Sequence, residues 1–420
     1  MEFREFVAKI RQARGTAVVG EPLNCNEIPH RVTQAERGGN RALLVDQVID
    51  SRAKVVGNLF GSASRICQAF SVRGYSQLFK RLDKAINNPV PVKFGACEPG
   101  DFTVTRSPDL KRLLPTIKYS QDDAAPYLTS GIVVTRFPSS ARRHACFVRM
   151  AVLGGNRLLF NPGTPRIKRI VDETVGRGEE LEVRILIGAP AEMILMACVT
   201  MPNQEDKLEV AQSLAGEGLV FSEDALPFPL STEYVMKARV VPQYEQEGPF
   251  GEIGGTYSVK ARNPVCLVDE LRVRRDPVFH SVSAGVAKEH LELLSLGPRS
   301  FLERIKREFP QIFRYELPVF GADRLAVLVV KERIDTEKLK ARLWDVPLVR
   351  GFIIVNQDVA SGSARDLLWA MLQRAPNSDH FRFTTERHPL YNTDRFVVDA
   401  SVSNLSAFEN KRVNVYRMAN

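Results

Sequence analysis

A series of short apolar runs, separated by turn residues, begins at residue 127 and constrains the fold more than any other feature of the chain. The runs cover residues 130–134, 145–152, 157–160, 181–187, 234–241 and 257–259. Runs of this length and spacing are typical of the β-strands of a sandwich or barrel. Two stretches with helical periodicity, 168–177 and 191–200, lie between them. We therefore predict a core domain over residues 127–285, built as a partly closed β-barrel with attached helices.

The chain before this core alternates helical and strand patterns. Residues 2–14 place apolar side chains at helical spacing and predict an amphipathic helix. Residues 42–45 and 53–60 are short apolar runs, which we expect to form buried strands. Residues 88–126 are polar and rich in Pro and Gly, as in a linker with irregular strands. We predict an N-terminal α/β cap and linker over residues 1–126.

The chain after the core is predicted to contain linker helices and a second α/β domain. Residues 287–296 and 299–309 both have helical periodicity, and we assign 286–312 to linker helices. Strand and helix patterns then alternate at residues 325–330, 335–344, 349–355 and 365–374. This alternation predicts a C-terminal α/β domain over residues 313–420. The whole chain is therefore expected to have an α/β (α+β) fold.

Composition and charge exclude several classes of protein. The net charge is +9, but the cations are spread along the chain and interleaved with acids, and no nucleic-acid-binding motif is visible. A basic balance also suits a pocket for phosphorylated ligands. The six cysteines form no CxxC pair, which favours reduced thiols. With no signal peptide and no apolar run of ~18 residues, we expect a cytoplasmic protein without a membrane span.

The stretch Glu247-Gly-Pro-Phe-Gly-Glu252 is the strongest candidate for a functional loop. Pro249 lacks an N–H and Gly251 frees the backbone, so the stretch cannot be the interior of a helix. Two carboxylates held in one cavity can divide their work, because one stays ionised beside a cation while the other is desolvated and carries a proton. The alternative is a surface turn with two solvated acids.

Four separated motifs, taken together, resemble those of one enzyme family. They are VVGNLFGS at 55–62, YLTSGIVVT with HACFVRM at 127–135 and 144–150, EGPFGE at 247–252 followed by Tyr257, and FIIVNQDV with DLLWAM at 352–359 and 366–371. In this order they are similar to the motifs of the UbiD family, decarboxylases that use prenylated FMN. The resemblance covers nearly the full length. It implies an FMN-binding split-barrel core between an N-terminal α/β cap and, after a linker helix, a C-terminal α/β domain.

The resemblance also implies a set of site residues. The catalytic residues carried over are Arg149, Glu247 and Glu252. Arg149 would hold Glu247 ionised and orient the substrate carboxylate, whereas Glu252 would deliver the proton after CO2 leaves. The cofactor-binding residues carried over are His144, Phe147, Val148, Arg149, Asn161, Pro162, Gly163, Arg166 and Lys207.

The resemblance fails at the positions that hold a divalent metal, usually Mn2+, in the family. The family's Asn position is His144 here, its His position falls on 164–166, which contains no His, and its Glu position falls on Lys207, near Glu205 and Glu209. An imidazole can bind Mn2+, but Arg and Lys cannot. Whether a metal is bound is therefore left open. Either Arg166 and Lys207 neutralise the cofactor phosphate directly, or the site has decayed. Lys207 could equally be a solvated helix charge.

The predicted function is non-oxidative decarboxylation of an α,β-unsaturated or aromatic carboxylic acid. The substrate could be a small phosphorylated enoic acid such as anhydromevalonate phosphate, and the resemblance implies a flavin prenyltransferase as cofactor supplier. We expect a homodimer or higher homo-oligomer, with no nucleic-acid partner. The main alternative is a catalytically altered relative that binds a phosphorylated ligand or a partner without decarboxylating, and nucleic-acid binding is a minor one.

Overall fold

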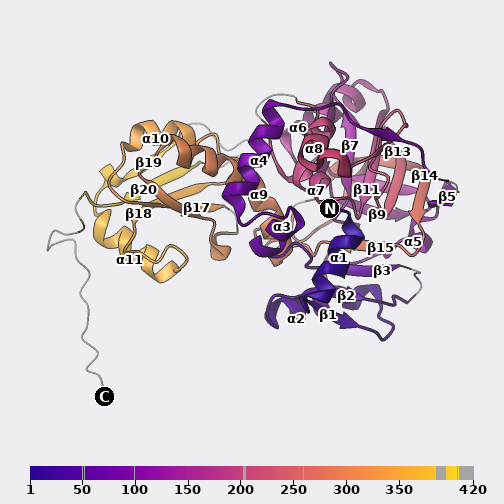
Figure 1. Ribbon diagram of the computed structural model, residues 1–420, viewed down its shortest axis with the longest axis horizontal. Coiled ribbons are helices and arrows are strands. Elements are labelled where there is room, and N and C mark those ends of the chain that lie inside the picture. Colours follow the sequence, from indigo (N-terminus) through magenta and orange to yellow (C-terminus); the bar gives the residue numbers. More distant parts are fainter. Residues whose placement is uncertain are drawn as a thin grey trace. The chain divides into compact units, whose positions relative to one another are not determined.

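A computed structural model describes the chain except residues 50, 52, 99, 202–204, 259, 323, 385–393, 404 and 406–420. The chain divides into two compact units, Met1–Leu296 and Gly297–Asn420 (Figure 1). The finer division that we predict, with boundaries after residues 126, 285 and 312, stays a prediction.

The largest sheet, in unit 1, has nine strands and curls into a half-barrel. Its spatial order is β6 (Tyr127–Leu128), β9 (Met150–Gly154), β10 (Arg157–Phe160), β14 (Ala261–Arg274), β13 (Tyr234–Glu247), β11 (Leu181–Ile187), β7 (Ile132–Arg136) and β8 (Arg143–Phe147), and β5 (Phe102–Arg106) pairs with β14. β6 continues into β7, and β8 into β9, so strands at opposite ends of this order are neighbours in the chain. The Val148 N–H also donates to the Gly131 carbonyl at 3.0 Å. The predicted partly closed barrel is confirmed.

Three strand predictions differ from the structure. The apolar run 145–152 is two strands, because the chain turns at Val148 and Arg149 between the two ends of the curled sheet. Residues 257–259 are not a strand: Tyr257 forms one isolated bridge with Gly251, and residue 259 lies outside the described residues. β14, which pairs with β10, β13 and β5, was not predicted. Its Pro264 and many charged residues hide the strand pattern.

Helices cover the half-barrel because alternate residues of each strand face opposite sides. Ile132 and Val134 pack in one cluster with α7 (Ala191–Cys198) and α8 (Lys207–Ala215). Val133, between them, packs in another cluster with α6 (Pro165–Thr174). Residues 191–196 of α7 are all buried, so this helix is covered on every side, and its one acid, Glu192, pairs with the amino group of Met1.

A smaller sheet in unit 1 is covered on both faces. Its order is β1 (Thr16–Val19), β2 (Ala42–Val45), β3 (Lys54–Gly57) and β15 (Val278–Ser281), and only the β2–β3 pair is antiparallel. Leu44 and Val56 pack with α1 (Phe3–Gln12), whereas Leu43 and Val55 pack with α2 (Ile28–Arg37) on the other face. The fourth strand, β15, comes after the barrel strands in the chain. The sheet of the N-terminal cap therefore includes residues beyond 126.

Shorter elements complete unit 1. They are α3 (Ala63–Ala69), α4 (Tyr75–Asn87), β4 (Phe94–Gly95), α5 (Leu110–Leu113) and β12 (Phe221–Ser222). β4 and β12 form a two-stranded parallel sheet. Of these two strands, β4 lies within residues 88–126, where irregular strands were predicted.

Unit 2 begins within α9 (Lys288–Glu308), a single helix that contains Pro298. The prediction of two helices here is wrong, because proline usually ends a helical pattern but is tolerated in this one. The five-stranded sheet has the order β16 (Ile312–Glu316), β17 (Leu325–Val330), β18 (Gly351–Asn356), β20 (Phe396–Ala400) and β19 (Phe381–Phe383). α10 (Thr336–Leu343) and α11 (Ala364–Arg374) cover opposite faces of it (Figure 1). The predicted C-terminal α/β pattern is confirmed.

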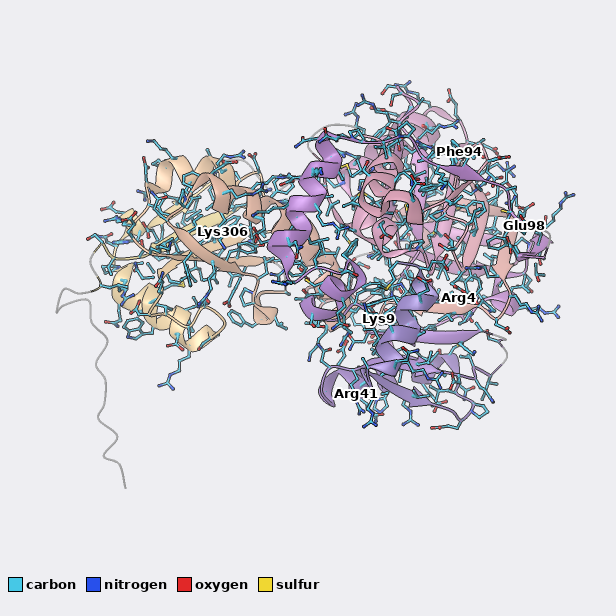
Figure 2. The ribbon with its side chains drawn as sticks, viewed as in Figure 1. Arg4, Lys9, Arg41, Phe94, Glu98 and Lys306 are labelled. Atoms are coloured by element: carbon cyan, nitrogen blue, oxygen red, sulfur yellow. The ribbon has the colours of Figure 1, made fainter. Side chains whose placement is uncertain are left out.

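The charged side chains are distributed over many elements of the chain. Figure 2 shows Lys9 on α1, Arg41 before β2 and Lys306 on α9 as separate cations. Among the described helices, none is both long and apolar enough to cross a bilayer.

Candidate active site

Arg149 lies where the chain turns from β8 into β9, and its guanidinium lies between two carboxylates. Its Nε donates to Glu247 Oε1 at 3.0 Å and its Nη2 to Glu247 Oε2 at 3.3 Å. Its Nη1 donates to Glu252 Oε1. Glu247 is the last residue of β13, and Glu252 lies in the loop that follows. The structure therefore brings the three predicted catalytic residues into one ion-pair network.

Glu247 is held as an acceptor by four hydrogen bonds. Besides the two from Arg149, Asn161 Nδ2 donates to its Oε2 at 2.7 Å and Asn263 Nδ2 at 2.5 Å. The carboxylate is only 2% exposed. A buried carboxylate that accepts only from N–H donors is stabilised in its charged form. All four bonds to Glu247 are donated by N–H groups, two of them from the cationic guanidinium of Arg149.

Asn263 is a site residue that the sequence did not reveal. It lies on β14, where it pairs with Glu245 of β13 and so sits on the strand beside Glu247. If β14 had been predicted as a strand paired with β13, the pairing would have placed Asn263 close to Glu247. Asn161 was predicted as a cofactor-binding residue. The structure gives its side chain a bond to Glu247, and its contact with a cofactor stays a prediction.

Arg149 is cationic and largely withdrawn from water. Burial lowers its pKa, but hydrogen bonds and charge from Glu247 and Glu252 outweigh this, so that its pKa lies above the ordinary value. The Phe250 ring centroid lies 4.8 Å from its Cζ, and the Tyr127 ring packs on Phe250 with the centroids 4.5 Å apart. Burial and the charge of Glu247 raise the pKa of Tyr127. Aromatic rings and carboxylates thus fix the guanidinium in one place.

The loop that carries Glu252 is clamped by the segment 120–124. Asp123 Oδ1 accepts the Gly251 N–H at 3.0 Å, and the Ala124 N–H donates to the Pro249 carbonyl at 2.9 Å. A Cβ at Gly248 would overlap the Cβ of Ala124, so glycine is required for this close approach. Burial raises the pKa of Asp123, although it accepts backbone N–H bonds. The predicted functional loop is therefore a rigidly held one.

The structure reverses the expected burial of the two acids. Glu252 was expected to be the desolvated acid, but its side chain is 36% exposed and paired with Arg149. That expectation is wrong, because the desolvated carboxylate is Glu247. Glu252 lies at the solvent side of the network.

A second group of predicted residues lies around His144. His144 is buried on β8, and both of its ring nitrogens lack a hydrogen-bond partner among the described residues. Burial, followed by the charges of Lys207 and Arg166, lowers the pKa of His144 well below its usual range. The imidazole is therefore neutral.

Lys207 is not the solvated helix charge considered from the sequence. Its side chain is buried, and its Nζ donates to the carbonyls of Ala145 and Val199, both at 2.8 Å, and of Met196. Burial lowers the pKa of Lys207 to about 8. All three N–H donors are used within the protein, so Lys207 can supply charge to a ligand but no free donor.

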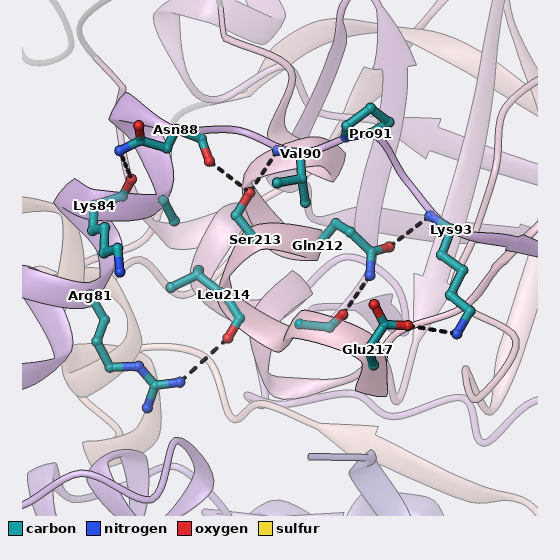
Figure 3. Close-up of a pocket in the computed structure, with 12 residues that line it drawn as sticks. Arg81, Lys84, Asn88, Val90, Pro91, Lys93, Gln212, Ser213, Leu214 and Glu217 are labelled. Atoms are coloured by element: carbon teal, nitrogen blue, oxygen red, sulfur yellow. Dashed lines mark hydrogen bonds and ion pairs between the residues drawn. The ribbon is translucent and has the colours of Figure 1, made fainter.

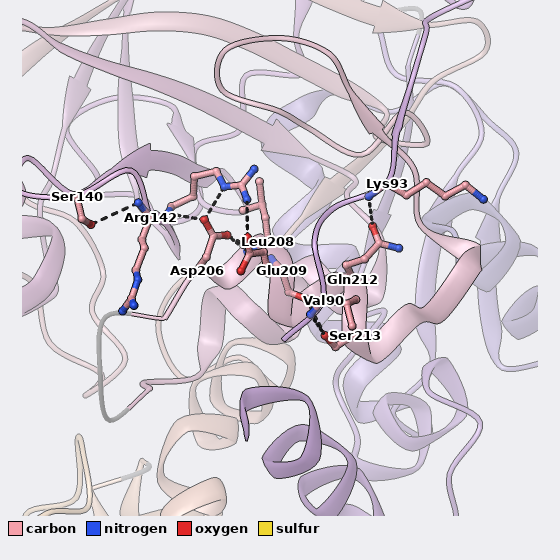
Figure 4. Close-up of polar contacts among 10 residues, drawn as sticks. Val90, Lys93, Ser140, Arg142, Asp206, Leu208, Glu209, Gln212 and Ser213 are labelled. Carbon is pink, nitrogen blue, oxygen red and sulfur yellow. Dashed lines mark hydrogen bonds and ion pairs between the residues drawn. The ribbon is translucent and has the colours of Figure 1, made fainter. Parts of the chain in front are cut away.

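The start of α8 fixes Lys207 in this position. Asp206 caps the helix, because its Oδ1 accepts the N–H groups of Leu208 at 3.0 Å and Glu209 at 3.2 Å (Figure 4). Its Oδ2 accepts from Arg143 Nε at 2.6 Å, which ties the cap to β8. The helix start and the strand are thus joined directly beside Lys207.

The remaining predicted cofactor residues connect the two groups along the chain. Phe147 is half-buried at the end of β8, and Val148 is buried next to Arg149. Pro162 and Gly163 follow β10 and lead into α6, where Arg166 Nη2 donates to the Met201 carbonyl at 3.0 Å. Burial lowers the pKa of Arg166, and the charge of Glu205 opposes this.

These residues do not fit a divalent metal ion. In the described part of the chain, no group of three or more His, Cys, Asp and Glu side chains is arranged to hold one. The three family positions carry one neutral imidazole and two cations, and cations repel a metal ion. They do fit an anion such as a cofactor phosphate.

Three cavities in the described part of the chain, of about 690, 560 and 400 Å3, are lined by none of the predicted site residues. A cavity of about 690 Å3 is lined by α4, the segment after it and α8, including Arg81, Lys84 and Glu217, and contains none of the predicted site residues (Figure 3). A second cavity, of about 400 Å3, is lined in part by Tyr119 and Val286. A Cβ at Gly255, in the Glu252 loop, would come within 3.3 Å of the side chain of Val286, which lines this cavity. Glu252 and the other predicted site residues are not among the residues that line it.

Comparison with known proteins agrees with this geometry. Residues 93–287 match the family model for the 3-octaprenyl-4-hydroxybenzoate carboxy-lyase Rift-related domain, and residues 12–85 that for the N-terminal domain of the same enzyme. An anhydromevalonate phosphate decarboxylase of Methanothermobacter thermautotrophicus is 25% identical over 347 residues, 80% of each chain.

Solved structures show the same fold. The UbiD-class enzyme HmfF of Pelotomaculum thermopropionicum, in an evolved dimeric form with prFMN, matches with a TM-score of 0.86 and 23% identity over 99% of this chain and 97% of that one. The vanillic acid decarboxylase of Sedimentibacter hydroxybenzoicus matches with a TM-score of 0.81 and 18% identity over 100% and 96%. Together with the two domain matches, the shared fold shows that the chain belongs to the UbiD family of carboxy-lyases.

Proposed function

We propose that the protein is a prenylated-FMN-dependent decarboxylase that acts on a small α,β-unsaturated or aromatic acid. Decarboxylase activity follows from family membership. The observation that carries the proposal for this chain is the guanidinium of Arg149 fixed between Glu247 and Glu252. This is the arrangement of one base-like and one proton-carrying acid around a cation that decarboxylation with reprotonation requires.

Each of the three residues has a distinct role in this proposal. Glu247, which is buried and paired with the guanidinium, holds Arg149 in place. Arg149 orients the substrate carboxylate, which its planar set of donors suits. Glu252 holds the proton that replaces CO2 on the substrate carbon, and its partial exposure allows it to take a new proton from water. Prenylated FMN, when bound, supplies the electron sink for the carbanion.

The substrate that we propose is a small phosphorylated enoic acid. The sequence similarity to an anhydromevalonate phosphate decarboxylase supports this class. A cavity of about 400 Å3, in which Val286 near the Glu252 loop is a lining residue, has a volume that suits a small substrate. Its charged lining residues are two cations, Arg37 and Lys288, and one acid, Glu36. We also propose that the protein is cytoplasmic and homo-oligomeric and receives its cofactor from a flavin prenyltransferase.

Substitution of Glu252 tests the proposal. Glu252→Gln keeps the shape and a hydrogen-bond donor but removes the transferable proton. The protein, co-expressed with a flavin prenyltransferase, should still bind the flavin, while decarboxylation and substrate hydrogen–deuterium exchange fall by ~100-fold or more, the scale of general-acid catalysis. Glu245→Gln, on β13 two residues before Glu247, is the control and should keep wild-type turnover. Wild-type turnover by Glu252→Gln would show that Glu252 does not deliver the proton, whereas a flavin-loaded wild-type protein that decarboxylates no small α,β-unsaturated or aromatic acid would favour the non-decarboxylating relative.

A further inference from the structure

One buried and one half-buried cation, Lys207 and Arg166, bond to the same short segment of unit 1. Lys207 Nζ donates to the Val199 carbonyl at 2.8 Å, and Arg166 Nη2 donates to the Met201 carbonyl at 3.0 Å, two residues further along. Lys207 also bonds to Ala145, the neighbour of His144 on β8. Arg166, Lys207 and His144 therefore form one cluster, which we call the cation cluster.

The cation cluster carries more positive than negative charge. Among the described residues, no carboxylate is placed against Lys207, and its hydrogen-bond partners are all carbonyls. Glu205 is the acid whose charge acts on Arg166. Burying a charge without a counter-ion is costly, and carbonyl dipoles offset only part of the cost. Two cations against one acid therefore favour an anionic ligand.

His144 supplies an independent observation. Both of its ring nitrogens are buried and lack a hydrogen-bond partner in the described part of the chain. Buried polar atoms are almost always hydrogen-bonded, so a group outside the chain is expected here. A neutral imidazole carries one N–H, which can donate to a phosphate oxygen. α6 starts at Pro165, and no side-chain hydrogen bond caps its first turn beside Arg166.

We propose that the cation cluster binds the phosphate of the flavin directly, without a divalent metal ion between them. This inference rests on the proposed function, because it assumes that a flavin phosphate is the ligand. Arg166 and His144 donate to phosphate oxygens, whereas Lys207, whose donors are all engaged, acts as a fixed charge. Two of the three side chains cannot bind a metal, and their charges repel one.

Titration of the apoprotein with FMN and with riboflavin tests this inference. Riboflavin lacks the phosphate, so FMN should bind at least about 10-fold more tightly, a difference typical of a charged hydrogen-bonded contact. The FMN affinity should stay the same, within about 2-fold, in EDTA and in added Mn2+. Metal analysis of the loaded protein should find no stoichiometric divalent ion.

Two variants locate the effect. Arg166→Gln should weaken FMN about 10-fold and leave riboflavin unchanged. Lys168→Gln is the matched control, because Lys168 lies two residues further on the same helix and its side chain is 62% exposed. Lys207→Met should also weaken FMN selectively, with thermal melting used to confirm that the buried variant folds.

Three outcomes would overturn the inference. One is FMN binding that EDTA abolishes and Mn2+ restores, and another is Arg166→Gln weakening FMN and riboflavin equally. In both cases the proposed function would stand if the protein decarboxylates its substrate. The third is no FMN binding under any metal condition, which would also remove the support for a flavin-dependent function.

Discussion

Glu247→Gln should destabilise unit 1 strongly, because Glu247 is the central acceptor of the site. Its carboxylate accepts two bonds from Arg149 and one each from Asn161 and Asn263. A glutamine must turn its NH2 toward at least one of these donors, so at least one contact becomes repulsive. It also removes the main counter-charge of a buried cation, although Glu252 still pairs with Arg149. Breaking a buried pair costs roughly 3–5 kcal/mol, so we expect about 3 kcal/mol here, toward the lower end.

Glu245→Gln is the matched control for this measurement. Glu245 lies two residues earlier on β13 and pairs with Arg157, but its side chain is 35% exposed. Exposed pairs contribute about 0–1 kcal/mol, so this variant should change little. Both tryptophans, Trp344 and Trp369, lie in unit 2, so tryptophan fluorescence does not report on the site. Hydrogen exchange of peptides from residues 127–282, measured in rising urea, follows unit 1 directly.

The comparison between the two variants decides the prediction. The urea concentration at the midpoint of hydrogen exchange in the barrel peptides should fall much further in Glu247→Gln than in Glu245→Gln. The tryptophan fluorescence transition measures the unfolding of unit 2 separately. Equal shifts would mean that the Glu247 network contributes no more than a surface ion pair, and that the burial of Glu247 has been misjudged.

Two further predictions concern the clamp and the cation cluster. Gly248→Ala should push the loop away from Ala124 and lower the rate of decarboxylation by at least about 10-fold. Adding Ala124→Gly to the same chain should restore the activity. A double variant as slow as the single one would refute this contact. Lys207 has a folded-state pKa of about 8 and an unfolded value of 10.5, so between these values the unfolded chain keeps a proton that the folded protein has lost. The apoprotein should therefore gain on the order of 2–3 kcal/mol of stability relative to Lys207→Met as pH rises from 7 to 10.5, and parallel profiles would contradict the burial of this ammonium.

Patterns that depend on local chain chemistry were readable from the sequence. The barrel strands β10 and β11 lie where the apolar runs predicted them, and the Gly- and Pro-containing stretch after Glu247 is a loop. Two carboxylates and Arg149 meet as expected. The strands and the loop depend on residues near one another in the chain. The meeting of Arg149 with Glu247, 98 residues later, was instead implied by the family resemblance.

The features that were missed depend on contacts between distant segments. Asn263 reaches Glu247 only because β14 pairs with β13, and no local pattern marked β14 as a strand. Lys207 stands on a helix whose polar residues look solvated, but three carbonyls from two other segments surround its ammonium. Burial of Glu247 rather than Glu252 likewise depends on how the clamp of residues 120–124 holds the loop. Spacing alone cannot supply these three facts.

One strand, β8, joins the group of site residues around His144 to the group around Arg149. The residues of the first group can therefore change while those of the second stay the same. His144 and Arg149 are five residues apart along β8 and the turn after it, at most about 16 Å in an extended chain. An elongated ligand with a phosphate at one end and a reactive ring at the other can reach both. The phosphate end needs only net positive charge and donors, and either a metal or cations can provide these. The Arg149 end needs an exact set of acids, because proton transfer depends on position. Exchange of metal ligands for Arg166 and Lys207 is therefore compatible with an unchanged reaction at Arg149, Glu247 and Glu252.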